Sequence, residues 1–166
     1  MIDDSDCGTP ATGIGRAEAC SLQCPACRFW SLWPVAAAEL PQCAGCGRPL
    51  PWVVPGTAAG FDAAIDTPAL VLVEFWAPWS GSSLALAPQL HRLAARHAGR
   101  LKLIKIEIDR EPGLGILHRV TGVPLLMIMT DGEEVDRRHG SPSEGQLTRW
   151  IDRWVTHRGR TAATAE

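Results

Sequence analysis

The stretch VLVEFWAPWSGSSLALAP, residues 71–88, decides the fold of this chain. Its first half is almost continuously apolar and rich in branched side chains, which is typical of a central strand buried on both faces. Its second half begins the apolar spacing of a helix, and Pro88 inside that spacing should kink the helix. A buried strand that passes directly into a helix indicates an α/β fold.

Further strands and helices alternate on either side of this stretch. An Asp-Gly pair at residues 131–132 is a hairpin signal and joins the last two strands. The order β-α-β-α-β-α-β-β-α predicts a mixed central sheet with helices on both faces. We expect strands at 52–54, 69–76, 101–108, 125–129 and 134–139, and helices at 58–66, 82–98, 113–120 and from 141 onward.

Composition limits the classes of function. The chain has 166 residues, of which 46% are hydrophobic and 20% charged, and its formal net charge is -2. These values fit one globular domain with a small addition, and they favour neither nucleic-acid nor membrane binding. The N-terminus has neither the basic start nor the apolar run of a secretory signal, so we expect a cytoplasmic location with reduced thiols.

The cysteines are concentrated at one end and divide the chain. All six lie in the first 46 residues, at Cys7, Cys20, Cys24, Cys27, Cys43 and Cys46. Such a change of composition indicates two units that are held together by different means. We expect a disordered N-terminus at 1–18, a small cysteine-rich ribbon at 19–50, an α/β domain at 51–157 and a disordered tail at 158–166.

Four of the cysteines form two C-x2-C pairs. Cys24 and Cys27 are separated from Cys43 and Cys46 by fifteen residues, 28–42. This spacing predicts a structural Zn²⁺ site, because each two-residue spacer forms a tight turn whose two thiolates point the same way. Two disulfides, or cysteines without a ligand, are the alternatives.

The two remaining cysteines have no assigned role at this stage. Cys20 precedes Cys24 by four residues, and Cys7 lies further out. Each could be a spare metal ligand, a reactive thiol or an unpaired cysteine.

Several short motifs follow one another in a specific order along the chain. They are the strand and its exit at 71–79, the helix proline Pro88, the strand 105–109, the loop 122–124, and the hairpin glycines Gly132 and Gly140. In this order they resemble the thioredoxin family, and the resemblance covers about residues 52–157 and implies the thioredoxin fold. The N-terminal ribbon makes the whole chain similar to the bacterial thioredoxin-2 type, which carries a four-cysteine zinc module.

The resemblance also locates a degenerate active site. The family's motif is Trp-Cys-Gly-Pro-Cys, whereas this chain has Trp-Ser-Gly-Ser-Ser, so Ser80 and Ser83 stand at both cysteine positions. A serine hydroxyl cannot perform thiol–disulfide exchange, which needs a thiolate nucleophile and a second thiol. Glu74 stands at the family's buried aspartate and Lys105 at its lysine. An ion pair between the two is the expected arrangement, and proton transfer by Glu74 is the alternative.

The resemblance further implies a polypeptide-binding groove. Pro124 would be the family's cis-proline, and the backbone of Val123 would pair with a bound polypeptide like an added strand. Surface apolar residues without a partner are the equally open alternative. The groove residues implied by the resemblance are Trp79, Gly81, Ser82, Gly122, Val123 and Pro124.

Three functions compete at this stage. The first is a redox-inactive thioredoxin-like protein that binds polypeptides or acts as a scaffold, with no nucleic-acid or membrane partner. The second is a protein-disulfide reductase whose two active-site cysteines were replaced by serine, and the third is a redox protein that uses Cys7 or Cys20. A nucleophilic Ser80 would need a base, for which His118 is the candidate, but a serine at a helix start is usually a cap.

Overall fold

The computed structural model describes residues 19–162, and its main body is a five-stranded sheet with four helices. The strands are β3 (Trp52–Pro55), β4 (Leu70–Trp76), β5 (Leu101–Glu107), β6 (Leu125–Thr130) and β7 (Glu133–His139). The helices are α1 (Phe61–Ile65), α2 (Gly81–Arg96), α3 (Pro112–Leu117) and α4 (Glu144–Ala162). The predicted alternation from residue 52 onward is therefore confirmed.

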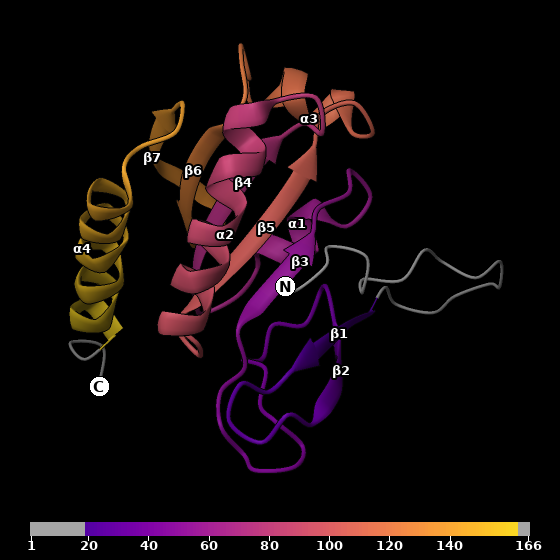
Figure 1. The fold of residues 1–166 in the computed structure, drawn as a ribbon, viewed down its shortest axis with the longest axis vertical. Helices are drawn as coiled ribbons and strands as arrows, with labels where there is room; N and C mark the ends of the chain where they lie inside the picture. The colour runs from indigo at the N-terminus through magenta and orange to yellow at the C-terminus, as the bar shows by residue number, and fades with distance from the viewer. Residues whose placement is uncertain (1–18, 163–166) are drawn as a thin grey trace, which may run out of the picture.

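The sheet has the order β3-β5-β4-β6-β7 (Figure 1). Strands β3, β5 and β4 are parallel, whereas β6 is antiparallel to β4 and β7 is antiparallel to β6. The two central strands β4 and β5 are buried along their length, as their continuous apolar runs predicted. This arrangement confirms the mixed sheet of a thioredoxin fold.

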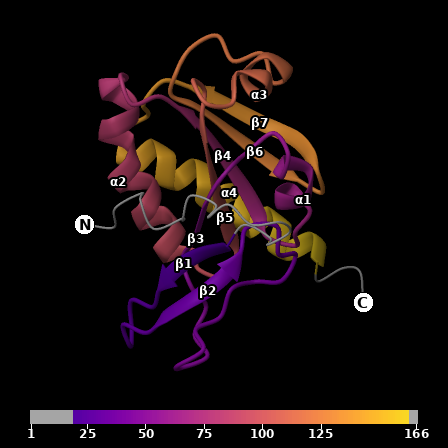
Figure 2. The same cartoon turned by 90° about the vertical axis from the view of Figure 1, so that its right-hand side faces the viewer.

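Side chains alternate across the sheet and build two cores. Leu70 and Leu72 of β4 lie in the core that α2 and α4 cover, through residues such as Leu90 and Trp150. Val71 and Val73 point to the other face, where α1, α3 and the N-terminal ribbon close the second core (Figure 2). Helices therefore cover both faces, and the backbone alternation of a strand explains the division.

The N-terminal ribbon contains β1 (Ala19–Gln23) and β2 (Trp30–Pro34), which form a separate antiparallel pair. Figure 1 shows it at the end of the molecule away from α3. Ribbon residues Val35 and Leu50 belong to the same buried cluster as Trp52 and Phe61 of the α/β domain. The ribbon is therefore packed into the second core.

Two helices are shorter than predicted, and one is longer. Helix α1 occupies only 61–65 of the predicted 58–66, and α3 occupies 112–117 where 113–120 was expected. Helix α4 continues to Ala162, past residue 158, where the predicted tail begins. Arg158 explains part of this, because its Nε donates to the carbonyl of Pro68 at 2.9 Å.

The predicted N-terminal segment 1–18 and the last residues 163–166 lie outside the described residues. Within the described range, no helix combines the length and apolarity that crossing a bilayer requires.

Candidate functional site

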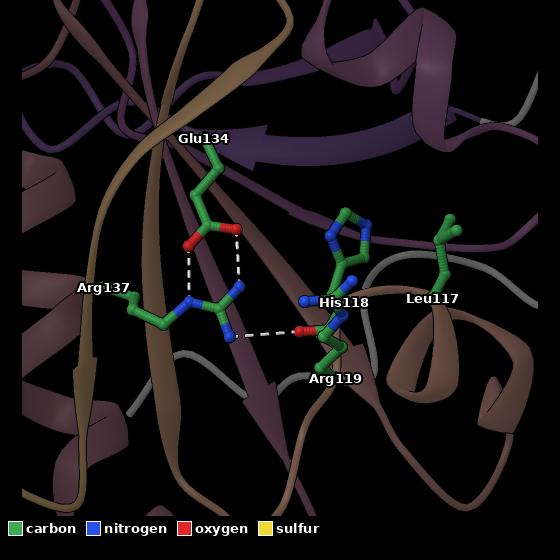
Figure 3. A pocket seen from close by; sticks show the side chains of 5 residues that line it. All are labelled: Leu117, His118, Arg119, Glu134 and Arg137. Atoms are coloured by element: carbon green, nitrogen blue, oxygen red, sulfur yellow. Dashed lines mark hydrogen bonds and ion pairs between the residues drawn. The ribbon is translucent and has the colours of Figure 1, made fainter.

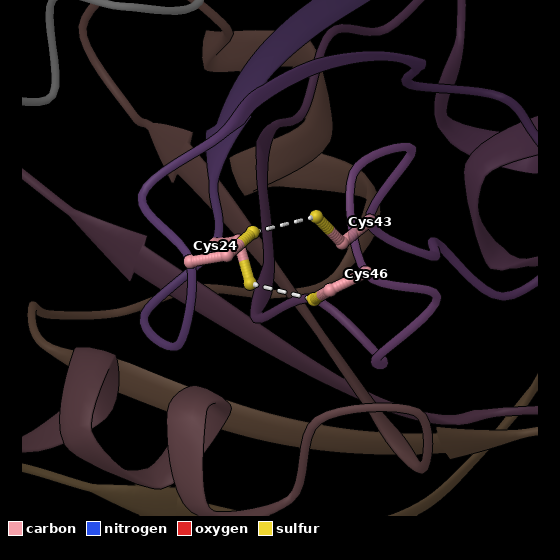
Figure 4. A group of neighbouring side chains, drawn as sticks. Cys24, Cys43 and Cys46 are labelled. Atoms are coloured by element: carbon pink, nitrogen blue, oxygen red, sulfur yellow. Dashed lines mark hydrogen bonds between the residues drawn. The ribbon is translucent and has the colours of Figure 1, made fainter.

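The four paired cysteines of the ribbon lie close together in space. Their sulfur atoms all lie within 4.8 Å of one another, with 3.7 Å between Cys24 and Cys46 and 3.4 Å between Cys27 and Cys43. Figure 4 shows Cys24, Cys43 and Cys46 converging from two separate turns. Four sulfurs at about 2.3 Å from a tetrahedral zinc ion would be about 3.8 Å apart. The cluster could therefore hold a metal ion of that size.

Each C-x2-C pair forms the same turn. The backbone N–H of Arg28 donates to the carbonyl of Cys24 at 2.9 Å, and that of Gly47 donates to the carbonyl of Cys43 at 2.8 Å. The residue after each second cysteine has a positive φ, 64° at Arg28 and 72° at Gly47. Glycine adopts this conformation without a steric penalty at Gly47, whereas the first turn has an arginine at the same point.

The backbone of these turns stabilises sulfur in its thiolate form. A hydrogen bond with the backbone of Cys27 lowers the pKa of Cys24 to about 6. Burial opposes thiolate formation at Cys43, but hydrogen bonds from the backbone of Cys46 and Gly45 and from neighbouring thiols leave its pKa lowered. Thiolates are the form in which cysteine binds a metal ion, so these shifts favour a cation at Cys24 and Cys43. At Cys27 a hydrogen bond with the backbone of Phe29 also favours the thiolate, but the hydrogen bond with the Cys43 thiol and burial raise its pKa to about 12.

A second group of polar side chains lies where β4 passes into α2. Ser80 is the N-cap of α2 and its Oγ accepts a hydrogen bond from the backbone N–H of Ser83 at 3.3 Å. The Ser83 hydroxyl also donates to Ser80 Oγ at 3.0 Å, and the hydroxyl oxygens of Ser80 and Ser82 lie 3.1 Å apart. Both Ser80 and Ser83 are buried. Ser80 therefore performs the capping function that serine commonly has at this position.

The predicted partners Glu74 and Lys105 lie side by side. They occupy paired positions of the parallel strands β4 and β5, so their side chains project from the same face. Glu74 is completely buried and Lys105 is 7% exposed, and the Lys105 Nζ lies 4.9 Å from the centre of the Trp76 ring. The register supports the expected pairing, and the ion pair itself stays a prediction.

The proline loop is joined to the start of α2 by the segment that follows β7. The peptide bond between Val123 and Pro124 is cis. The N–H of Gly140 donates to the carbonyl of Pro124 at 2.9 Å, and the Ser141 hydroxyl donates to the carbonyl of Ser82 at 2.9 Å. The predicted groove residues at 81–82 and 122–124 are therefore brought together by residues 140–141, which sequence analysis did not identify as part of the site.

Trp79 lies on the surface beside this junction. Its side chain is 68% exposed, and its indole Nε1 donates to a carboxylate oxygen of Asp109 at 2.7 Å. An exposed tryptophan held by one end presents its apolar faces in a fixed position. Asp109 belongs to the strand motif quoted for the resemblance, but its bond to Trp79 could not be deduced from the sequence.

His118 does not act on Ser80 in this structure. Its ring lies 5.1 Å from the ring of Phe61 and 5.6 Å from that of Phe75, and burial lowers its pKa. It borders a shallow pocket in which Arg137 pairs with Glu134 and donates to the His118 carbonyl at 3.1 Å (Figure 3). No hydrogen bond joins it to Ser80 among the described residues, so a serine–histidine nucleophile gains no support.

Cys20 is buried and is disulfide-bonded in the structure. In this state Cys20 offers no free thiol, and because a disulfide is itself one state of a redox couple, a redox role for Cys20 stays a prediction. Cys7 lies outside the described residues.

Comparison with known proteins gives one consistent result. A thioredoxin family model matches residues 52–153. Thioredoxins from Staphylococcus aureus strains Mu50, MW2 and N315 are each 32% identical to this chain over 101 residues, which is 61% of this chain and 96% of each relative. The residues that the family model matches include Ser80, Ser83 and the loop 122–124. The four-cysteine ribbon lies outside the matched range.

Proposed function

This chain belongs to the thioredoxin family, and from that premise we propose that it is a redox-inactive member that binds a polypeptide partner. The observation that carries the proposal is the hydroxyl pair at residues 80 and 83. The Ser83 hydroxyl donates to Ser80 Oγ at 3.0 Å at the start of α2, where the family resemblance places two thiols. Neither oxygen can form or release a mixed disulfide.

The retained surface supports polypeptide binding. Val123 precedes the cis peptide bond, and among the described residues its backbone N–H and carbonyl enter no hydrogen bond. Free backbone groups and an exposed tryptophan on the same domain suit a strand-like peptide, because main-chain hydrogen bonds supply affinity and the apolar face supplies contact area. The proposed groove comprises Trp79, Gly81, Ser82, Gly122, Val123 and Pro124.

We also propose that Cys24, Cys27, Cys43 and Cys46 hold one structural zinc ion. Four thiolates fill a tetrahedral coordination shell and leave no open position for a substrate. The two turns carry matching hydrogen bonds, and the ribbon lies away from α3 at the opposite end of the molecule. These features favour a role in holding the ribbon folded.

A cytoplasmic location is the remaining part of the proposal. The four clustered cysteines are free thiols, which suits a reducing compartment, whereas the disulfide at Cys20 does not. Thiol labelling of protein taken directly from cells would decide between these two observations. A labelled Cys20 would support a reducing compartment, and an unlabelled Cys20 would count against it.

Polypeptide binding is tested with labelled, carboxymethylated insulin B chain as the probe. We expect fluorescence anisotropy to show binding to the native chain, and Trp79→Ala to weaken it about tenfold, because a central tryptophan commonly dominates such a contact. Trp30→Ala is the matched control, because Trp30 is a half-exposed tryptophan on the ribbon. Equal affinity of the two variants would exclude the groove as the binding surface.

The second function, a disulfide reductase altered at two positions, makes a separate prediction. The native chain should not catalyse insulin reduction by dithiothreitol, and Ser80→Cys with Ser83→Cys should gain activity if the surrounding groups still support exchange. The single change Ser83→Cys is the control, because it lacks the first nucleophile. Catalysis by the native chain would contradict the redox-inactive proposal, and the genomic codons at 80 and 83 would show which residues are natural.

A further inference from the structure

An arginine-lined hollow lies between the edge strand β7 and helix α4. It is an open depression of about 310 Å³, and its lining residues are Arg138, Gln146, Arg149, Trp150 and Arg153. None of them belongs to the proposed groove or to the cysteine cluster. Figure 1 shows β7 and α4 next to each other at one side of the molecule.

The positions of the three arginines follow from strand and helix geometry. Arg138 pairs with Leu126, whose side chain belongs to the core beneath α4, so Arg138 projects toward that helix. Arg149 and Arg153 are four residues apart on α4 and therefore share one side of it. The fold thus directs three guanidinium groups from two elements to one hollow.

The guanidinium group of Arg138 is held by packing on an aromatic ring, which leaves its N–H groups free to donate. The Arg138 guanidinium lies 5.0 Å from the centre of the Trp150 ring, and Trp150 is only 2% exposed. A guanidinium stacked on an aromatic ring keeps its in-plane N–H groups available. Among the described residues, the side chains of Arg138 and Arg149 enter no hydrogen bond or ion pair.

The carboxylate of Asp136, which lies next to the hollow, already accepts hydrogen bonds from other side chains. Asp136 Oδ2 accepts the indole N–H of Trp150 at 2.7 Å and that of Trp154 at 3.2 Å, and it lies 3.6 Å from Arg153. Among the described residues, Arg153 is the only one of the three arginines that pairs with Asp136, and no carboxylate lines the hollow. An excess of positive charge therefore remains there.

We propose that this hollow binds a small oligophosphate, an anion with two or three linked phosphate groups. Guanidinium groups match phosphate oxygens with paired, charge-assisted hydrogen bonds, and several phosphates in one ligand can engage several arginines. Gln146 adds an amide donor at the N-terminal half of the same helix. This site goes beyond the proposed polypeptide binding and does not depend on it.

The test uses inorganic triphosphate and isothermal titration calorimetry on the full chain at low ionic strength. We expect binding to the native chain and a loss of about tenfold or more in affinity for Arg138→Gln with Arg149→Gln. The matched control is Arg48→Gln with Arg110→Gln, which removes two exposed charges outside the hollow. In nitrogen-edited NMR spectra, triphosphate should shift the indole signal of Trp150 and leave that of Trp52 in place.

Two further ligands, titrated in the same way, distinguish an oligophosphate site from a site for single phosphates or acidic peptides. Orthophosphate and a hexa-aspartate peptide should each bind more weakly than triphosphate. Equal affinity of the two double variants, no binding to the native chain, or equal affinity for orthophosphate would overturn the proposal. Tighter binding of the acidic peptide would overturn it in favour of a polypeptide ligand.

Discussion

At the scale of single residues, the exchange of sulfur for oxygen decides the chemistry at the start of α2. Ser80 and Ser83 are buried and satisfy each other, so the helix begins normally although the thiols are absent. A cap hydrogen bond of this kind commonly contributes about 1 kcal/mol to helix stability. The substitution is therefore compatible with a stable fold while it excludes thiol–disulfide exchange at these two positions.

A second residue, Lys102, connects the two units of the molecule. Its Nζ is completely buried and donates to the carbonyls of Val35 at 2.8 Å and Ala64 at 2.7 Å. It also lies 4.2 Å from the centre of the Trp52 ring. The ammonium group therefore satisfies one carbonyl that follows β2 and another in α1, and it holds the ribbon against the α/β domain.

Lys102→Met should lower the free energy of unfolding at pH 7 by about 1–3 kcal/mol, because two buried carbonyls lose their donor. Chemical denaturation measures this change, and Arg110→Met is the control for loss of an exposed charge. A variant as stable as the native chain would show that the two hydrogen bonds contribute nothing net.

The same lysine predicts a dependence on pH. Burial lowers its pKa from 10.5 to about 8, so between these values the unfolded chain binds more protons than the folded chain. The contribution of Lys102 to stability should therefore rise as pH increases from about 8 to 10.5. Subtracting the Lys102→Met curve from the native curve isolates this contribution, and a flat difference would contradict it.

At the scale of elements, the ribbon depends on its two matching cysteine turns. Strands β1 and β2 have five residues each, and a two-stranded pair of that size is marginal without further support. A metal ion shared by the four clustered sulfurs would cross-link the two cysteine turns and stabilise this strand pair. Binding of the metal and folding of the ribbon should then be coupled.

Purified protein should accordingly contain zinc at about one ion per chain. Removal of zinc by a strong chelator should abolish the dispersed NMR signals of residues 19–50, and added zinc should restore them. Cys43→Ser should bind zinc more weakly than the native chain. Ser21→Ala should not, because the hydroxyl of this β1 serine makes no hydrogen bond to either cysteine turn among the described residues. Native-like ribbon signals in zinc-free protein would refute the structural role.

At the scale of the whole molecule, the ribbon and the α/β domain share one core. Val35 and Leu50 lie in the same buried cluster as Trp52 and Phe61. Loss of zinc should therefore lower the unfolding temperature of the α/β domain as well, in the same cooperative transition. Circular dichroism at a helix wavelength would detect this, and two independent transitions would show that the units are not coupled.

The sequence by itself determined the order of the elements, the mixed sheet and the cysteine cluster. It did so because buried strands, hairpin turns and C-x2-C turns depend on short-range patterns that neighbouring residues carry. It also placed the serines at the start of α2, because the motif around them is local.

Only the tertiary structure decided how distant residues meet. The bond from Trp79 to Asp109, the position of Lys102 between the ribbon and α1, and the continuation of α4 around Arg158 all join residues that are far apart in the chain. Such contacts depend on packing and on the search for buried hydrogen-bond partners, which no local pattern encodes. The arginine hollow arises for the same reason, since β7 and α4 bring its side chains together only after the sheet has formed.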